Sequence, residues 1–105
     1  MDNEFLRTEE AIVTALKTVY DPEIPVNVYD LGLIYDVEVD EEKNVRIRMT
    51  LTAPHCPAAD YIMEDIRMKV EGVEEVRSVA LELVFEPEWN KAMMSEEAQL
   101  ELGLL

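Results

Sequence analysis

A change in hydrophobic period between residues 45 and 72 constrains the fold more than any other feature of this sequence. Over residues 45–52 apolar and polar side chains alternate, which is the pattern of a half-buried strand. After Pro57 the apolar residues follow helical spacing, and Gly72 ends the pattern. The alternating apolar residues are Val45, Ile47, Met49 and Leu51, and the helical ones are Ala59, Ile62, Ile66 and Val70. The sequence therefore predicts a strand-to-helix junction just before Pro57.

The segment before this strand predicts a helix followed by short extended elements. Thr8 is a suitable N-cap for a helix that runs to about Tyr20, and Pro22 ends it because proline forces the preceding residue away from the helical region. Val26 and Val28 are expected to form a short strand. A second strand is expected over residues 33–39 and a polar hairpin turn over residues 40–44.

The remaining elements complete an α+β fold. The helix after Pro57 runs to Glu71. Val73 is expected to open a last strand, which alternates over residues 79–85 and is ended by Pro87, and Ser95 caps a short C-terminal helix. Acidic residues at 36 and 38 are expected to face arginines at 46 and 48 across the hairpin. We expect one domain over residues 1–105, an α/β sandwich with a small mixed sheet of three to four strands and two main helices on one side.

Composition limits the classes of partner. The chain has 24 acidic and 9 basic residues and a net charge of −15, so nucleic acid and anionic membranes should repel it. No apolar run approaches the roughly 18 residues of a membrane helix. The chain has one cysteine, which cannot form an intrachain disulfide. A cytoplasmic protein is the default expectation.

The stretch from Thr50 to Pro57 holds the only cysteine and the only histidine of the chain. Pro57 suits the first position of a helix, so Cys56 is expected at the N-cap. Free backbone N–H groups and the helix dipole would favour the thiolate there, as in reactive or metal-binding cysteines. The alternative is a small buried cysteine without chemistry.

A stiff acidic loop, Asp21-Pro22-Glu23-Ile24-Pro25, is the second candidate site. Its two prolines fix the backbone around two carboxylates. Such a loop can supply metal ligands or a docking element. It can equally be a turn in which Asp21 bonds the backbone, since Asp-Pro is a common turn dipeptide.

The residue inventory excludes several chemistries. With three glycines the chain has no phosphate-binding loop and no dinucleotide fingerprint. A zinc site or an iron–sulfur cluster normally needs four ligands, which one cysteine and one histidine cannot supply. A homodimer could bring two Cys56 thiolates together, with His55, Asp21 or Glu23 completing the site. Such a site would suit transient holding or transfer of a metal or cluster.

Several motifs in order resemble one known family. They are Asp21-Pro22-Glu23-Ile24-Pro25, the run from Val28 to Tyr35, Thr50-Leu51-Thr52 with Cys56-Pro57, and Pro87-Glu88-Trp89 before Met94-Ser95. Together they resemble the metal–sulfur cluster assembly factor family. That family includes SufT-like proteins, the PaaD-like component of phenylacetate degradation and the eukaryotic cytosolic iron–sulfur assembly targeting subunit.

The resemblance implies an α/β domain like other iron–sulfur assembly domains and an accessory role in maturing iron–sulfur proteins. It implies a pocket formed by Asp21, Glu23, Thr52 and Cys56, with Cys56 as the thiolate that meets a transient iron–sulfur cluster or iron. His55 lies at a position that the family pattern does not fix, and from the residues alone it is a candidate metal ligand beside Cys56. The implied partners are assembly machinery and client apo-proteins.

Three alternatives remain open on sequence. The chain could be a cluster-free adaptor that docks clients through its acidic surface and apolar C-terminal tail, with Cys56 structural. It could serve phenylacetate degradation alone, as PaaD-like proteins do. It could also be a thiol enzyme with Cys56 as nucleophile, although adjacent residues such as His55 and Cys56 usually point apart.

Overall fold

The computed structural model describes residues 3–21, 24–51 and 59–104. Its elements, in chain order, are α1 (Asn3–Leu16), β1 (Ile34–Val39), β2 (Asn44–Met49), α2 (Ala59–Glu71), β3 (Ser78–Leu83), the 3₁₀ helix η1 (Lys91–Met93) and α3 (Glu96–Glu101).

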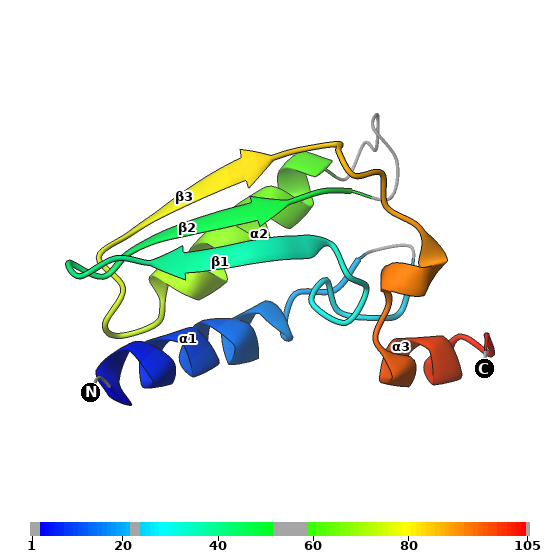
Figure 1. Ribbon diagram of the computed structural model, residues 1–105, viewed down its shortest axis with the longest axis horizontal. Coiled ribbons are helices and arrows are strands. Elements are labelled where there is room, and N and C mark those ends of the chain that lie inside the picture. The colour runs from blue at the N-terminus through cyan, green and yellow to red at the C-terminus, as the bar shows by residue number, and fades with distance from the viewer. Residues whose placement is uncertain (1–2, 22–23, 52–58, 105) are drawn as a thin grey trace.

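The three described strands form one mixed sheet in the order β1-β2-β3 (Figure 1). Strands β1 and β2 pair antiparallel through the hairpin, and β2 and β3 pair parallel because α2 crosses over between them. The α+β class with a mixed sheet and a short C-terminal helix, as predicted, is confirmed.

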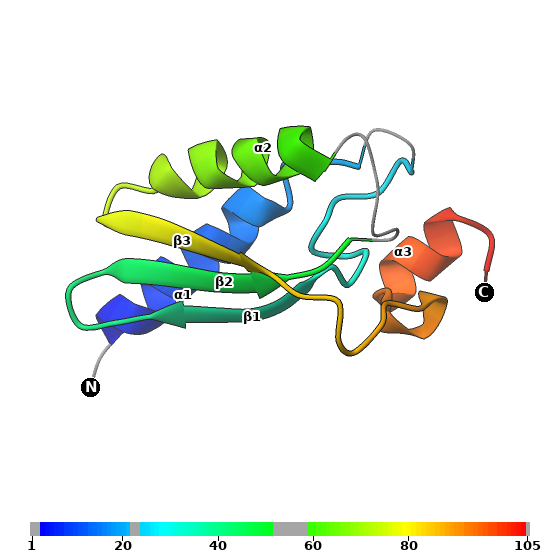
Figure 2. The same cartoon turned by 90° about the horizontal axis from the view of Figure 1, so that it is seen from above.

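One face of the sheet forms the core. Val45, Ile47 and Met49 of β2 are buried, whereas Arg46 and Arg48 between them are exposed. Both long helices cover the apolar face and leave the other face open (Figure 2). The period-two pattern thus places the core correctly, because a strand with one polar face can be covered on one side only.

The open face carries opposite charges in register. Asp36 lies opposite Arg48 and Glu38 opposite Arg46, as the sequence predicted. The ion pair that forms nevertheless joins Arg46 Nη2 to Glu82 Oε1 on β3, at 3.0 Å. This face is a solvated, charged surface.

The structure corrects the bounds of four elements. Strand β3 begins at Ser78 and not at Val73, because the chain first turns after α2, where the Val76 N–H donates to the Val73 carbonyl at 3.0 Å. Helix α1 begins at Asn3 and ends at Leu16, so Thr8 lies inside it and is not its N-cap. Residues 26–28 form no strand and contribute only an isolated bridge between Tyr20 and Asn27. Strand β2 ends at Met49, before the Thr52 that alternation suggested.

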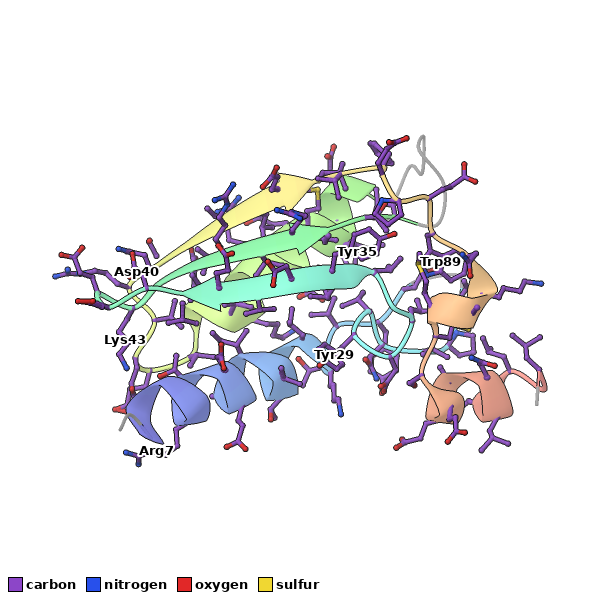
Figure 3. The ribbon with its side chains drawn as sticks, viewed as in Figure 1. Arg7, Tyr29, Tyr35, Asp40, Lys43 and Trp89 are labelled. Carbon is purple, nitrogen blue, oxygen red and sulfur yellow. The ribbon has the colours of Figure 1, made fainter. Side chains whose placement is uncertain are left out.

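Thr8 was misassigned because its hydroxyl has a tertiary partner. Thr8 Oγ1 donates to Glu75 Oε1 at 3.2 Å, and Lys43 Nζ reaches both the Thr8 hydroxyl and the Glu75 carboxylate (Figure 3). The Lys43 ammonium, followed by the Thr8 hydroxyl, holds the pKa of Glu75 below its ordinary value. This cluster joins α1, the β1–β2 turn and the segment after α2.

Other predicted ends agree with the structure or fall outside it. Helix α2 ends at Glu71 as expected, and Ser95 caps α3 by accepting a hydrogen bond from the Ala98 N–H. The expected start of the second helix at Pro57 lies outside the described residues. Within the described ranges no helix is both long and apolar enough to cross a membrane.

Gly32 marks the closest approach between the loop after α1 and the C-terminal part of the chain. Its φ is +82°, and a Cβ placed there would lie 2.4 Å from the Met93 carbonyl oxygen. Next to it, Trp89 Nε1 donates to the Leu31 carbonyl at 2.8 Å, and the Ser95 N–H donates to the Asp30 carbonyl at 2.8 Å. We call these three contacts the C-terminal clamp.

The Glu75 cluster predicts a pH dependence of stability. A carboxyl whose folded pKa is depressed stabilises the fold above its unfolded pKa of about 4.3, and this contribution is lost as the pH falls through the lower folded pKa. Glu75→Gln and Lys43→Met should therefore both lose less stability than the parent on acidification. Urea unfolding at several pH values below 6 measures this, and superimposable pH profiles for all three proteins would contradict it.

The clamp predicts unequal costs for two glycine substitutions. Gly32→Ala should lower the free energy of unfolding by about 3 kcal/mol, from left-handed backbone strain plus the collision with the Met93 carbonyl. Gly103→Ala is the matched control, because Gly103 has φ +75° but open space around it, and should cost about 1 kcal/mol. If urea unfolding showed the same loss of unfolding free energy for both variants, the close approach of Gly32 to the Met93 carbonyl would be ruled out.

Candidate functional site

The segments that carry the predicted site meet at one end of the sheet. The C-terminal end of β2, the N-terminal end of α2 and the loop that follows α1 all lie at the end where α3 also packs (Figures 1 and 2). The segment that contains Cys56 joins β2 to α2. Both of its described flanks therefore lie at the same end of the sheet as the loop after α1.

Asp21 is the one predicted site residue within the described part of the chain. Its side chain is 7% exposed, and Oδ1 accepts a hydrogen bond from the Ile24 N–H at 3.1 Å. The Asp21 N–H in turn donates to the Val26 carbonyl at 3.4 Å. The expectation that Asp21 bonds the backbone is confirmed by the hydrogen bond from the Ile24 N–H. Pro22 and Glu23, between these two residues, lie outside the described part of the chain.

Beyond this turn, a second turn continues the loop. Asn27 Oδ1 accepts from the Asp30 N–H at 2.8 Å, and Asn27 Nδ2 donates to Asp30 Oδ2 at 2.8 Å. The chain then returns to the sheet, where the Thr50 N–H donates to the Leu33 carbonyl at 2.8 Å. Thr50 and Leu51, which precede the cysteine segment, are both buried. The loop is thus tied directly to the residues that lead into the predicted site.

Four predicted site residues, Glu23, Thr52, His55 and Cys56, lie outside the described residues. Their gathering with Asp21 into one pocket stays a prediction. Within the described ranges, which exclude the chain's histidine and cysteine, no three carboxylates are placed to hold a metal ion.

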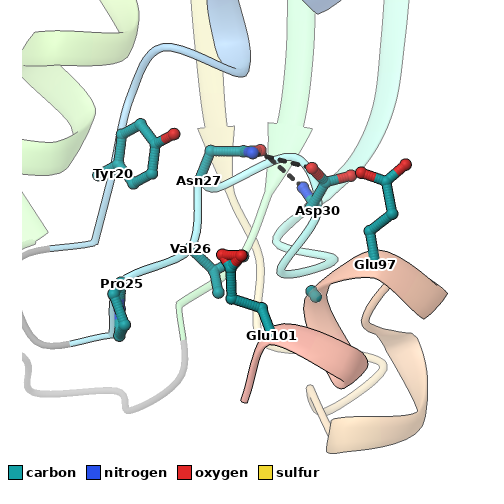
Figure 4. Close-up of a pocket in the computed structure, with 8 residues that line it drawn as sticks. Tyr20, Pro25, Val26, Asn27, Asp30, Glu97 and Glu101 are labelled. Atoms are coloured by element: carbon teal, nitrogen blue, oxygen red, sulfur yellow. Dashed lines mark hydrogen bonds between the residues drawn. The ribbon is translucent and has the colours of Figure 1, made fainter. Parts of the chain in front are cut away.

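Sequence reasoning missed a cavity of about 210 Å³ between α3 and the loop (Figure 4). Asp30 and two of the three glutamates of α3, Glu97 and Glu101, direct their carboxylates toward it, and the ring of Tyr20 lies on its far side. Glu97 and Glu101 are four residues apart, which places them on one face of α3, and this spacing was the available signal. The lining residues are Tyr20, Pro25, Val26, Asn27, Asp30, Glu97, Ala98 and Glu101.

Comparison with family models decides the family. Residues 9–82 match the model described as "Iron-sulfur cluster assembly protein". The chain belongs to this family. The resemblance drawn from the motifs is thereby confirmed.

Individual relatives agree with this assignment. The chain is 70% identical over 105 residues to the "Fe-S protein maturation auxiliary factor" of Porphyromonas gingivalis, which covers all of both chains. It is 35% identical to the "Fe-S protein maturation auxiliary factor SufT" of Staphylococcus aureus, covering 82% of this chain and 98% of the other. At 29% identity, 87% of the chain matches 26% of an "Iron-sulfur cluster carrier protein" of Synechocystis.

A solved structure supports the fold. The crystal structure of a domain of unknown function, DUF59, from Bacillus anthracis superposes with a TM-score of 0.88. It is 37% identical, and the match covers 95% of each chain. The family's fold is therefore the one described above.

The Asp21 turn gives a prediction for stability. Asp21→Ala removes the acceptor for the Ile24 N–H and should lower the free energy of unfolding by about 1–2 kcal/mol. Asp21→Asn keeps the Oδ1 acceptor and should lose less. Urea unfolding of both variants measures the difference, and an alanine variant as stable as the parent would contradict the role given to this carboxylate.

Proposed function

We propose that this protein is an accessory factor in the maturation of iron–sulfur proteins. In this proposal it carries, transfers or targets an iron–sulfur cluster or iron through Cys56 and does not turn over a metabolite. Membership of the iron–sulfur cluster assembly family carries the proposal, and the names of the full-length relatives agree with it.

The ligand inventory favours transient holding. Clusters are normally held by four thiolates, whereas this chain has one cysteine. A cluster bound at Cys56 therefore needs ligands from a second molecule, which is either another copy of the chain or the protein that delivers or receives the cluster. If the client supplies the remaining ligands, the cluster is already bound to the client while it is bound to Cys56. The cluster then passes to the client when the Cys56 thiolate lets go of it. The carrier protein that shares part of this sequence agrees with such a role.

The acidic loop is proposed to assist the thiolate. Asp21 is buried and accepts a hydrogen bond from the Ile24 N–H. The loop after α1, to which it belongs, lies at the end of the sheet where both described flanks of the cysteine segment lie. In the proposal Asp21, Glu23 and Thr52 line the site and orient the ligands, and His55 is an additional candidate ligand. The partners are assembly proteins and client apo-proteins, and the proposed compartment is the cytoplasm.

Client maturation in cells tests the proposal. In a Porphyromonas gingivalis strain that lacks its 70% identical relative, this chain should restore the activity of a cluster-dependent hydro-lyase. Cys56→Ala and Cys56→Ser should each fail to restore it, because neither side chain supplies a thiolate. The measurement is enzyme activity in anaerobic extracts, together with the amount of the client polypeptide.

Controls separate chemistry from folding. Glu41→Gln changes an exposed carboxylate in the β1–β2 turn, at the opposite end of the sheet, and should restore activity as the parent does. Circular dichroism of the cysteine variants should match the parent. Full restoration by Cys56→Ala would favour the cluster-free adaptor, in which Cys56 is structural. Restoration by neither the parent nor the control would refute the maturation role itself.

A further inference from the structure

Helix α3 and the chain end after it leave apolar side chains without cover. Leu100 is 62% exposed and Leu104 is 44% exposed, and Tyr20, across the cavity from α3, is 55% exposed. Ala98, on the other side of the helix, is buried against the fold. The helix is thus anchored by one face while its outer face presents leucines to solvent. Two exposed leucines at and just after the end of one short helix are a feature of interaction surfaces.

Carboxylates border these apolar side chains and have no cationic partner. The ion pairs within the described residues join Lys43 to Glu75, Arg46 to Glu82 and Lys69 to Asp65, so Asp30, Glu97 and Glu101 take part in none of them. None of the nine lysines and arginines lines the cavity. The three carboxylates line a space of about 210 Å³, more than ten times the roughly 10–15 Å³ that one water needs.

The arrangement does not suit a metal ion or a second copy of the chain. Among the described residues, these three carboxylates included, no group of three is placed to hold a metal ion. A second copy related by a two-fold axis would present the same carboxylates to this surface, so like charges would face each other. A lysine or arginine side chain fits better, because its long stem can lie along leucine or tyrosine while its charged end reaches the carboxylates.

We propose that the outer face of α3 and the adjoining cavity form a docking surface for a basic, amphipathic segment of a partner protein. A lysine or arginine of that segment enters the cavity among Asp30, Glu97 and Glu101, with Tyr20 beside it, and its apolar residues cover Leu100 and Leu104. Charge complementarity and the uncovered leucines carry this proposal. The surface and the chemistry of its partner are argued without the proposed function. If the partner is a protein of the iron–sulfur maturation machinery, that assignment alone rests on the proposed function.

Binding of a defined peptide tests the surface. The probe is a synthetic peptide of roughly twelve residues, made of leucine and lysine with the leucines on one helical face. It is titrated into the full ¹⁵N-labelled chain, free of metal, at physiological salt. Amide signals of Tyr20, Asn27, Asp30 and α3 should shift, and a peptide with glutamine in place of every lysine should bind much more weakly.

Matched variants locate the binding energy. Glu97→Gln/Glu101→Gln should weaken binding about fivefold, as expected from the loss of two exposed ion pairs. Glu41→Gln/Glu42→Gln removes the same charge from the β1–β2 turn and should leave the affinity about unchanged. Leu100→Ser should weaken binding, because it removes an exposed apolar contact. Each variant's circular dichroism is checked against the parent.

The outcomes distinguish this surface from the cysteine site. The Cys56→Ser variant should bind the peptide as the parent does. The docking proposal can therefore fail while the proposed role of Cys56 holds, and the role of Cys56 can fail while the docking proposal holds. Equal weakening by the two double variants would mean general attraction to an acidic protein and would overturn the proposal. The proposal would also be overturned if the peptide did not bind, or if amide signals shifted only in other elements. Self-association of the chain through α3 in the absence of peptide would overturn it as well.

Discussion

The close contact between Gly32 and the Met93 carbonyl is the constraint on which this end of the molecule depends. A Cβ at position 32 would lie 2.4 Å from the Met93 carbonyl oxygen, and the backbone there has a left-handed φ of +82°. Glycine suits both conditions, so it lets the loop after α1 contact the C-terminal segment. The Trp89–Leu31 and Asp30–Ser95 hydrogen bonds then fix the two segments together. Each such bond contributes only about 1 kcal/mol, so the three contacts act as a set.

This clamp connects parts of the chain that are far apart in sequence. The loop that it holds is bonded through the Leu33 carbonyl to Thr50, the residue directly after β2, and Asp21 accepts a hydrogen bond from the Ile24 N–H near the loop's start. The clamp also places α3 beside the loop, which creates the acidic cavity. The proposed docking surface and the described residues that lead into the cysteine segment, Thr50 and Leu51, are therefore connected to the same loop.

The sequence predicts the parts of the fold that follow from local periodicity. Alternation at Val45, Ile47 and Met49 identified a one-sided strand, and the Ser95 cap identified α3. Thr8 was misassigned because a hydroxyl looks the same in sequence whether it caps a helix or bonds a distant Glu75. The clamp and the cavity were not predicted, since both depend on tertiary contacts between segments about 60 residues apart. The roles of Cys56, His55, Thr52 and Glu23 stay predictions from sequence and family.

Anaerobic reconstitution tests the central claim, that Cys56 holds iron–sulfur cargo transiently. The chain and its Cys56→Ser variant are incubated with iron and sulfide, and visible absorbance and iron per chain are measured after desalting. The account predicts cluster absorbance in the parent at well below one cluster per chain, because one thiolate is too few, and none in the variant. Equal binding by both proteins, or no binding by either, would contradict it.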